Sequence, residues 1–133
     1  MFASTGSFGL ECRARGSSDV TFVENYTDAS DVLKKNIEKF NCEDKSIVIN
    51  EDVSNGDIES KLIDKKFDII FLDPPYKTEN FINILNKIID IKLLNKNGII
   101  IIHRSKKTLE SLPKNFQIVQ IKTYGISKII FGY

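Results

Sequence analysis

Short runs of β-branched and aromatic residues recur along the chain and are bounded by polar or turn-forming residues, a pattern typical of β-strands. Two of these runs, Phe67–Leu72 and Gly98–His103, are almost continuously apolar. Parallel strands that are covered on both faces have this composition, so both runs are expected in the middle of a sheet. The predicted strands are Val20–Val23, Ser46–Asn50, Phe67–Leu72, Gly98–His103, Phe116–Tyr124 and Lys128–Tyr133.

Segments with apolar residues at helical spacing separate several of these strands, which predicts amphipathic helices between them. Asp28 is expected to cap the first helix and Thr78 the second, because short polar side chains are favoured at helix starts. A weaker helix is expected at Asp57–Ile63. The predicted apolar stripes are Leu33, Ile37 and Phe40 in the first helix and Phe81, Leu85, Ile88 and Ile89 in the second.

Alternating strands and helices predict an α/β fold with right-handed crossovers, a mostly parallel central sheet and helices on both faces. The last two strands differ, because the short stretch from Tyr124 to Ser127 leaves no room for a helix between them. They are expected to form an antiparallel hairpin at one edge of the sheet. A length of 133 residues without repeats or linkers favours one domain, 1–133.

The bulk composition excludes several classes of protein. The chain is 41% hydrophobic and 28% charged, with a formal net charge of +1, so it lacks the general attraction for phosphate of a strongly basic nucleic-acid binder. Cys12, Cys42 and the single His103 are far apart in sequence, which argues against a disulfide framework or a metal site. We expect no membrane segment and no secretory signal, and hence a reducing, cytoplasmic setting.

A run of small residues from Ser4 to Gly9 precedes a helix-favouring segment, Leu10–Arg15, that Gly16 would end. Such a strand-loop-helix turn directs backbone N–H groups at one point, where they can hold a phosphate or a carboxylate. The run lacks the first glycine of the dinucleotide-binding fingerprint, since Ser4 stands there. An ordinary tight turn would explain the pattern equally well.

Two acidic positions follow predicted strands at places where a nucleoside could be bound. Glu24 ends the strand that begins at Val20, about 20 residues after Ser4, the distance at which an acid can accept hydrogen bonds from ribose hydroxyls. Asp52 follows Ser46–Asn50 and is the candidate partner of an adenine amino group. A solvated strand end and an exposed acidic turn are the alternatives for these two residues.

Asp73-Pro74-Pro75-Tyr76 comes directly after the apolar run Phe67–Leu72. The two prolines fix φ and disfavour helix, so the segment is predicted to be stiff and extended. The Asp73 carboxylate and the Pro74 carbonyl could accept hydrogen bonds from an exocyclic base amine and stabilise the charge that develops as it attacks a sulfonium methyl group. Tyr76 would stack on a base that is flipped out or single-stranded. An ordinary surface turn is the alternative.

The chain resembles the RsmD family of bacterial small-subunit ribosomal RNA guanine-N2 methyltransferases. The resemblance rests on the segment from Phe2 to Glu11, which is similar to that family's F-A-G-[ST]-G-x-x-G-L-E signature, and on Arg15-Gly16, Val20–Glu24, Phe67–Tyr76 and Tyr124-Gly125. It implies a Rossmann-like class I methyltransferase fold, S-adenosylmethionine as methyl donor, and guanine N2 in ribosomal RNA or an assembling small subunit as acceptor. We expect a monomer that acts without a metal.

The resemblance also implies roles for individual residues. Asp73, Pro74, Pro75 and Tyr76 would hold the target base. The residues expected to contact the cofactor are Phe2, Ser4, Thr5, Gly6, Gly9, Glu24, Asn25, Asp52, Val53 and Asp73. Two departures stand out: Ser4 replaces a glycine, and family members carry further residues before the glycine loop. The chain is therefore expected to lack an N-terminal segment and to have a truncated first strand.

Other functions remain open from the sequence. The Asp-Pro-Pro-Tyr segment also occurs in adenine-N6 methyltransferases, the glycine loop with Glu24 would suit an NAD-dependent oxidoreductase, and a shortened chain could be a silent remnant. His103 and Arg104 end a predicted central strand on the ligand side of the sheet and could touch RNA phosphate, but they are interpreted as a solvated strand end, as is Lys106-Lys107. Phe116, Ile118 and Ile121 are expected in the core. Cys12 is interpreted as a packing residue, because nothing nearby would lower its pKa.

Overall fold

The computed structural model describes residues 1–54, 57–75, 80–109 and 111–133. The chain divides into two compact units, Met1–Gly56 and Asp57–Tyr133. Each unit contains its own sheet, with strand order β1-β2 in the first and β3-β4-β6-β5 in the second. The two units are described one at a time.

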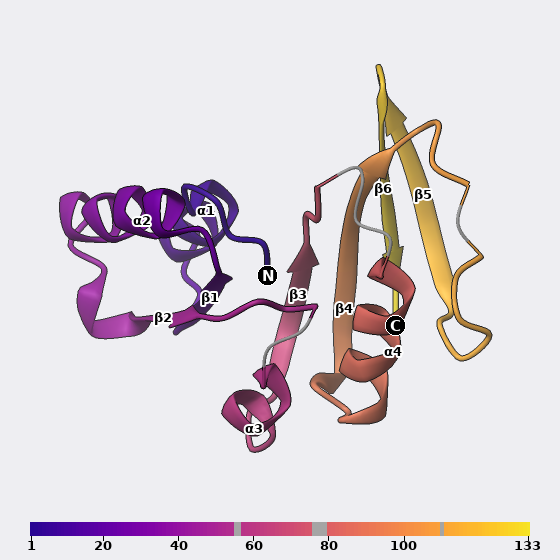
Figure 1. Cartoon of the computed structure of the whole chain (residues 1–133), viewed down its shortest axis with the longest axis horizontal. Helices are drawn as coiled ribbons and strands as arrows, with labels where there is room; N and C mark the ends of the chain where they lie inside the picture. The colour runs from indigo at the N-terminus through magenta and orange to yellow at the C-terminus, as the bar shows by residue number, and fades with distance from the viewer. Residues whose placement is uncertain (55–56, 76–79, 110) are drawn as a thin grey trace. The chain divides into compact units, whose positions relative to one another are not determined.

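The first unit is a two-stranded parallel sheet with two helices (Figure 1). Its elements are α1 Ser7–Ala14, β1 Val20–Glu24, α2 Thr27–Lys39, the short 3-10 helix Glu43–Lys45 and β2 Ser46–Asn50. Both predicted strands are confirmed, and they pair in parallel from Val20↔Ser46 to Glu24↔Asn50. A parallel pair needs a crossover between its strands, and α2 supplies it.

The core of this unit lies between α2 and β1. Phe22, Leu33 and Ile37 are buried there, so two residues of the first predicted stripe are confirmed. The prediction for Phe40 is wrong, because this residue follows the last residue of α2 and is 59% exposed. The predicted cap is also wrong: α2 begins at Thr27 after an extended Tyr26, which places Asp28 inside the first turn.

The second unit contains one mixed sheet and two helices. Its elements are α3 Ile58–Leu62, β3 Phe67–Leu72, α4 Phe81–Asp90, β4 Leu94–Ser105, β5 Ile118–Tyr124 and β6 Ser127–Gly132. β3 and β4 are parallel, whereas β6 is antiparallel to both β4 and β5. The C-terminal hairpin at the sheet edge is therefore confirmed (Figure 1). The predicted cap Thr78 lies outside the described residues.

The second unit also corrects three expectations about burial. β4 lies inside its sheet as predicted, but β3 forms the edge, and Ile69 on it is 49% exposed. Phe116 is buried, whereas Ile118 and Ile121 are about half exposed. The reason is that β5 is the other edge strand, and all of its residues are exposed. β-branched residues favour a strand conformation without requiring that it be buried.

α4 is the best-packed helix of this unit. Phe81, Ile84, Leu85 and Ile88 on it are buried, at the i, i+3, i+4, i+7 spacing of one helix face. The predicted stripe is thus confirmed at Phe81, Leu85 and Ile88, while Ile89 is partly exposed. None of the helices in the described ranges is long and apolar enough to cross a membrane.

Candidate functional site

The glycine loop of the first unit is shorter than the sequence indicated. α1 already begins at Ser7, so the loop covers Ser4 to Gly6 and Gly9 lies inside the helix. A Cβ added at Gly9 would come within 2.3 Å of the Phe22 ring, and one at Gly6 within 2.3 Å of Leu33 Cδ1. Both glycines therefore lie where a larger residue would collide with the packing of this unit. Gly6 also has a φ of +83°, which L side chains rarely adopt.

Two further residues, one before the loop and one in it, have left-handed backbone conformations. Phe2 has a φ of +57° and Ser4 a φ of +49°, although neither is glycine. Such conformations cost of order 1–3 kcal/mol each and persist only where surrounding contacts impose them. The family signature has glycine where Ser4 stands, and the positive φ gives the physical reason for that preference.

Glu24 supplies the contacts that hold this loop. Its side chain is buried, with 6% of the residue exposed. Oε2 accepts the backbone N–H of Ser4 at 2.7 Å, and Oε1 accepts those of Asn25 and Tyr26 at 3.0 Å. One carboxylate thus joins the glycine loop, the end of β1 and the residues that precede α2. An ionised carboxylate has about four acceptor positions, so about one stays available to a ligand.

Two more contacts fix the same loop. Asn36 on α2 donates its Nδ2–H to the Thr5 carbonyl at 2.9 Å. The N–H of Ala3 donates to the Val23 carbonyl at 3.0 Å, so the chain runs alongside the end of β1 just before the loop. The loop is therefore held by side chains from two elements and by the backbone of β1.

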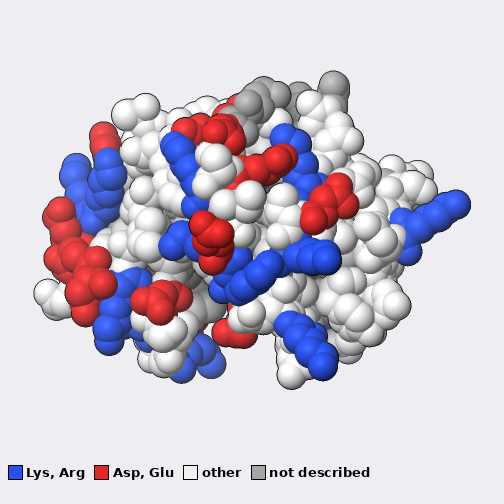
Figure 2. Space-filling view, turned by 90° about the horizontal axis from the view of Figure 1, so that it is seen from below, with Lys and Arg blue, Asp and Glu red and all other residues white. Residues whose placement is uncertain are grey.

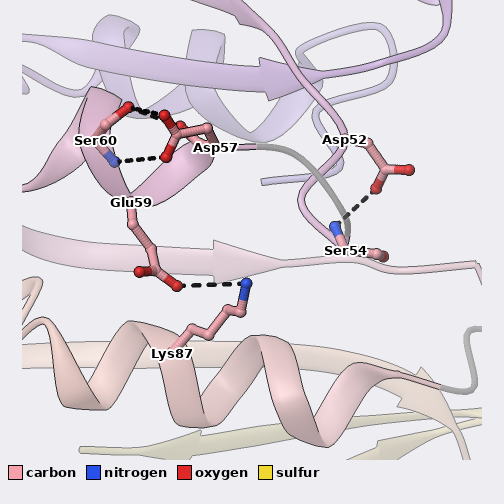
Figure 3. A network of polar contacts seen from close by, with 6 residues as sticks. All are labelled: Asp52, Ser54, Asp57, Glu59, Ser60 and Lys87. Atoms are coloured by element: carbon pink, nitrogen blue, oxygen red, sulfur yellow. Dashed lines mark hydrogen bonds and ion pairs between the residues drawn. The ribbon is translucent and has the colours of Figure 1, made fainter.

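The segment after β2 contains the remaining predicted cofactor residues. Asp52 Oδ1 accepts the backbone N–H of Ser54 at 2.7 Å (Figure 3), which forms a local turn. Its carboxylate is partly exposed, and Val53 beside it is buried at 3%. These observations show no ligand, so the roles of Asp52 and Val53 remain predictions.

The Asp73 segment lies in the second unit and immediately follows β3. Asp73 Oδ1 is 2.7 Å from His103 Nδ1, on β4. Pro74 is buried, whereas Pro75 is exposed. Tyr76 lies outside the described residues. The expected contact of Asp73 with the cofactor of the glycine loop involves both units. It stays a prediction.

Arg104, the next residue on β4, holds the other end of this segment. Its Nη1–H donates to the Pro75 carbonyl at 3.2 Å, and its guanidinium carbon lies 4.9 Å from the centre of the Phe81 ring on α4. Arg104 is only 1% exposed. The prediction of a solvated strand end is wrong for both residues, because His103 contacts Asp73 and Arg104 contacts the Pro75 carbonyl. The two side chains leave β4 on opposite faces, since successive strand residues alternate.

Sequence reasoning missed these two residues because they belong to no motif. Their only signal is a position at the carboxyl end of a strand predicted to neighbour the one that carries Asp73, where side chains of parallel strands meet. Lys106 and Lys107 are exposed as expected. Burial and the nearby Glu11 raise the pKa of the Cys12 thiol despite an opposing effect of Arg15, which does not favour a reactive thiolate; its packing role stays a prediction.

The surface carries both signs of charge. Figure 2 shows Lys and Arg side chains interspersed with Asp and Glu on the face drawn, consistent with the net charge of +1. In the second unit Glu59 on α3 and Lys87 on α4 form one exposed ion pair, 3.3 Å apart (Figure 3). Exposed pairs of this kind contribute little to stability.

A family model described as "Conserved hypothetical protein 95" matches residues 1–133, which is the whole chain. The chain belongs to this family. Ribosomal RNA small subunit methyltransferase D of Haemophilus influenzae is 27% identical over 125 residues, and that of Buchnera aphidicola is 31% identical over 121 residues. The resemblance to the RsmD family is thus confirmed. The two alignments cover 94% and 91% of this chain but only 65% and 62% of the relatives.

Solved structures show which fold the chain has. A conserved hypothetical protein of Streptococcus pyogenes has 28% sequence identity and a TM-score of 0.82, covering 98% of this chain and 81% of the other. An SAH-bound methyltransferase of Podospora anserina is only 14% identical but has a TM-score of 0.73, covering 97% and 68%. The chain therefore has the α/β class I methyltransferase fold.

Proposed function

We propose that this chain transfers a methyl group from S-adenosylmethionine to the exocyclic N2 amine of a guanine in small-subunit ribosomal RNA. Its similarity to proteins named ribosomal RNA small subunit methyltransferase D supports methyl transfer to ribosomal RNA. The observation that carries the chemistry is the Asp73 carboxylate, which follows β3 on a proline-stiffened segment and is anchored at 2.7 Å by His103.

The first unit offers groups that fit the proposed cofactor. The N–H groups of Ser4 and Gly6 already donate to Glu24 and to the Ala3 carbonyl. The Thr5 N–H and the N-terminus of α1 would therefore face the methionine carboxylate of the cofactor, because a loop that leads into a helix concentrates donors. Glu24 would accept from the ribose hydroxyls with its remaining acceptor position. Asp52, with one oxygen bonded to Ser54 at 2.7 Å, would accept from the adenine amino group with the other. When bound, S-adenosylmethionine supplies an electrophilic methyl group on a sulfonium.

The second unit would bind and orient the acceptor. A guanine amine is a weak nucleophile because its nitrogen lone pair is delocalised into the ring. Hydrogen bonds from its two N–H groups to Asp73 and to the Pro74 carbonyl would favour a pyramidal nitrogen and stabilise the positive charge that develops there. The side chain of Asp73 is 43% exposed, so it is accessible to a base. The buried ring of Pro74 fixes the backbone beside it.

The substrate would reach these groups only if its base left the duplex. Unstacking a paired base costs a few kcal/mol, so single-stranded or partly assembled RNA is the favoured form. The mixed charges of the face in Figure 2 are consistent with recognition that depends on local contacts more than on a general attraction for RNA.

Methyl transfer from labelled S-adenosylmethionine tests this proposal. Purified ribosomal RNA and small subunits are the two substrates, and nucleoside analysis identifies the product. We expect N2-methylguanosine. Detection of N6-methyladenosine would instead identify adenine as the acceptor. A stabilisation by NAD without one by S-adenosylhomocysteine would contradict methyl transfer altogether.

The paired variants Asp73→Asn and Asp68→Asn test the assignment of the carboxylate. Both residues belong to the β3 region, but Asp68 lies near the opposite end of the strand, where its Oδ1 accepts from Asn95 Nδ2 at 2.7 Å. Asp73→Asn is expected to reduce kcat by about 100- to 1,000-fold, and Asp68→Asn to leave kcat unchanged. Equal effects of the two substitutions would remove Asp73 from the proposal.

A further inference from the structure

His103 lies against Asp73 and is the single histidine of the chain. The two residues are thirty positions apart, but Asp73 directly follows β3 and His103 lies on β4, and the two strands pair in parallel up to Leu72↔Ile102. The side chain of His103 is 24% exposed and that of Asp73 is 43% exposed. The contact is therefore built by the pairing of the two strands and lies where solvent and ligands can reach the carboxylate.

The chemistry of the contact assigns the donor. An ionised carboxylate can only accept, so Nδ1 of the imidazole must carry the proton that lies between the two groups. In a neutral imidazole the other nitrogen, Nε2, is then an acceptor. This contact occupies Oδ1 of Asp73. Among the residues that the structure describes, no hydrogen bond to Oδ2 of Asp73 occurs.

We propose that His103 is a positioning residue for methyl transfer: its Nδ1–H fixes the Asp73 carboxylate so that Oδ2 faces the amine of the target base. This inference rests on the proposed function. A carboxylate held in one orientation before the reaction loses no energy to reorientation as charge develops on the amine nitrogen. A freely rotating Asp73 would present either oxygen, and misplaced acceptors can cost about 100-fold in rate.

The neighbouring Arg104 has a different task, which makes the role of His103 separable. Arg104 is buried, donates to the Pro75 carbonyl and packs on Phe81, so it ties the segment to α4. The partly exposed His103 contacts the reacting carboxylate itself. A substitution at His103 should therefore change catalysis with little change in folding.

NMR of the imidazole tests the contact without any activity measurement. Because the chain has one histidine, 15N labelling of histidine gives a single pair of ring signals. We expect the Nδ1-protonated form in the wild-type chain at a pH where the ring is neutral. In Asp73→Ala the Nδ1 signal should shift away from its wild-type value, because the hydrogen bond from Nδ1 to Asp73 Oδ1 is gone.

Two amide substitutions test the role in catalysis. The side-chain nitrogen of asparagine can occupy the place of Nδ1, whereas that of glutamine extends to the place of Nε2. His103→Asn should therefore keep a donor to Asp73 Oδ1, and His103→Gln should lose it. We expect kcat of His103→Gln to fall by about 10- to 100-fold with the KM for S-adenosylmethionine unchanged, and His103→Asn to retain most of kcat.

Each result decides the inference. An Nδ1-protonated ring together with rescue by asparagine but not by glutamine supports it. An Nε2-protonated ring in the wild-type chain overturns it, as do equal rates for the two amide variants. Absence of methyl transfer by the wild-type chain overturns the proposed function and this role with it, and the wild-type rate distinguishes that failure from a failure of the His103 assignment alone.

Discussion

The glycine loop of the first unit and the Asp73 segment of the second are both anchored by side chains, but the anchors act on different groups. The loop is held through its backbone, since one buried carboxylate, Glu24, accepts the Ser4 N–H and two N–H groups at the start of α2. The Asp73 segment is held by two side chains of β4 that act on a carboxylate and a carbonyl. Stability and chemistry are therefore coupled differently in the two regions.

In the first unit the same contacts build the loop and shape the proposed cofactor site. A change there should reduce stability and ligand binding together. In the second unit the anchors are separate, because Arg104 is buried and supports the fold while His103 touches the reacting group. Changes at these two residues should separate stability from rate.

The largest effect on stability is expected from Glu24→Ala. Three backbone N–H groups would lose a charged acceptor in a buried place, which should lower the free energy of unfolding by about 3 kcal/mol. Urea unfolding followed by circular dichroism measures this change. The matched control is Glu11→Ala, whose exposed ion pair with Arg15 should contribute less than about 1 kcal/mol. Similar losses for both variants would show that Glu24 does not hold the loop.

Arg104→Met should lower the free energy of unfolding by about 2 kcal/mol, because it removes the hydrogen bond to Pro75 and the contact of the guanidinium with Phe81. Methionine retains the apolar stem, so the loss reports on the charged group. The same unfolding experiment on Lys106→Met, at an exposed neighbouring position, should give a change within about 0.5 kcal/mol. An unchanged Arg104→Met variant would contradict the anchoring role.

Gly9→Ala should destabilise the first unit by about 1–2 kcal/mol, because the new Cβ would lie 2.3 Å from the Phe22 ring. In a Phe22→Leu background, where the side chain is smaller, Gly9→Ala should lower the free energy of unfolding by less than it does in the wild-type chain. A double-mutant cycle measures this coupling. Strict additivity would mean that α1 does not pack on β1 through this contact.

The smallest effect is expected at the start of α3. Hydrogen bonds from the Ser60 hydroxyl and backbone N–H (Figure 3) lower the pKa of Asp57. Lys61 and Lys87 act in the same direction. A lowered folded-state pKa stabilises the fold above the unfolded value and loses this effect as pH falls through the folded value. The Tm difference between wild type and Asp57→Ala should thus shrink from about pH 7 to about pH 3.

The exposed Asp64 provides the control for that experiment. Asp64 lies just beyond the end of α3, so Asp64→Ala removes a nearby carboxylate without removing the N-terminal cap. Its Tm difference from wild type should stay small throughout the same pH range. A pH-independent difference for Asp57→Ala would mean that the carboxylate does not cap the helix.

The sequence predicted best those features whose cause is local. The strands β2 and β3 have the predicted bounds, because β-branched runs ended by polar residues define them. The glycine loop was visible since glycine and an acid stand at a characteristic spacing, although α1 begins earlier than expected. Burial along β5 was not predictable, because edge position depends on the strand order and not on the composition of the strand.

The anchors of the Asp73 segment were missed for a similar reason. His103 and Arg104 follow four isoleucines and look like the polar end of an apolar strand. Their importance arises only when β4 pairs with β3 in register, which brings residue 103 to residue 73. The role of Glu24 toward a ligand stays a prediction, and its three backbone hydrogen bonds could not be read from a single position.

The alternation of side chains along β4 has a consequence for how this protein can change over evolutionary time. β4 is paired on both sides, to β3 up to Ile102 and to β6 through Ser105, and strand faces alternate with every residue. Inserting or deleting one residue before Ile102 would exchange the imidazole and the guanidinium between the two faces of the sheet. A point substitution at either position changes one anchor and leaves the other in place, whereas a change of length in this strand would remove both anchors in a single step.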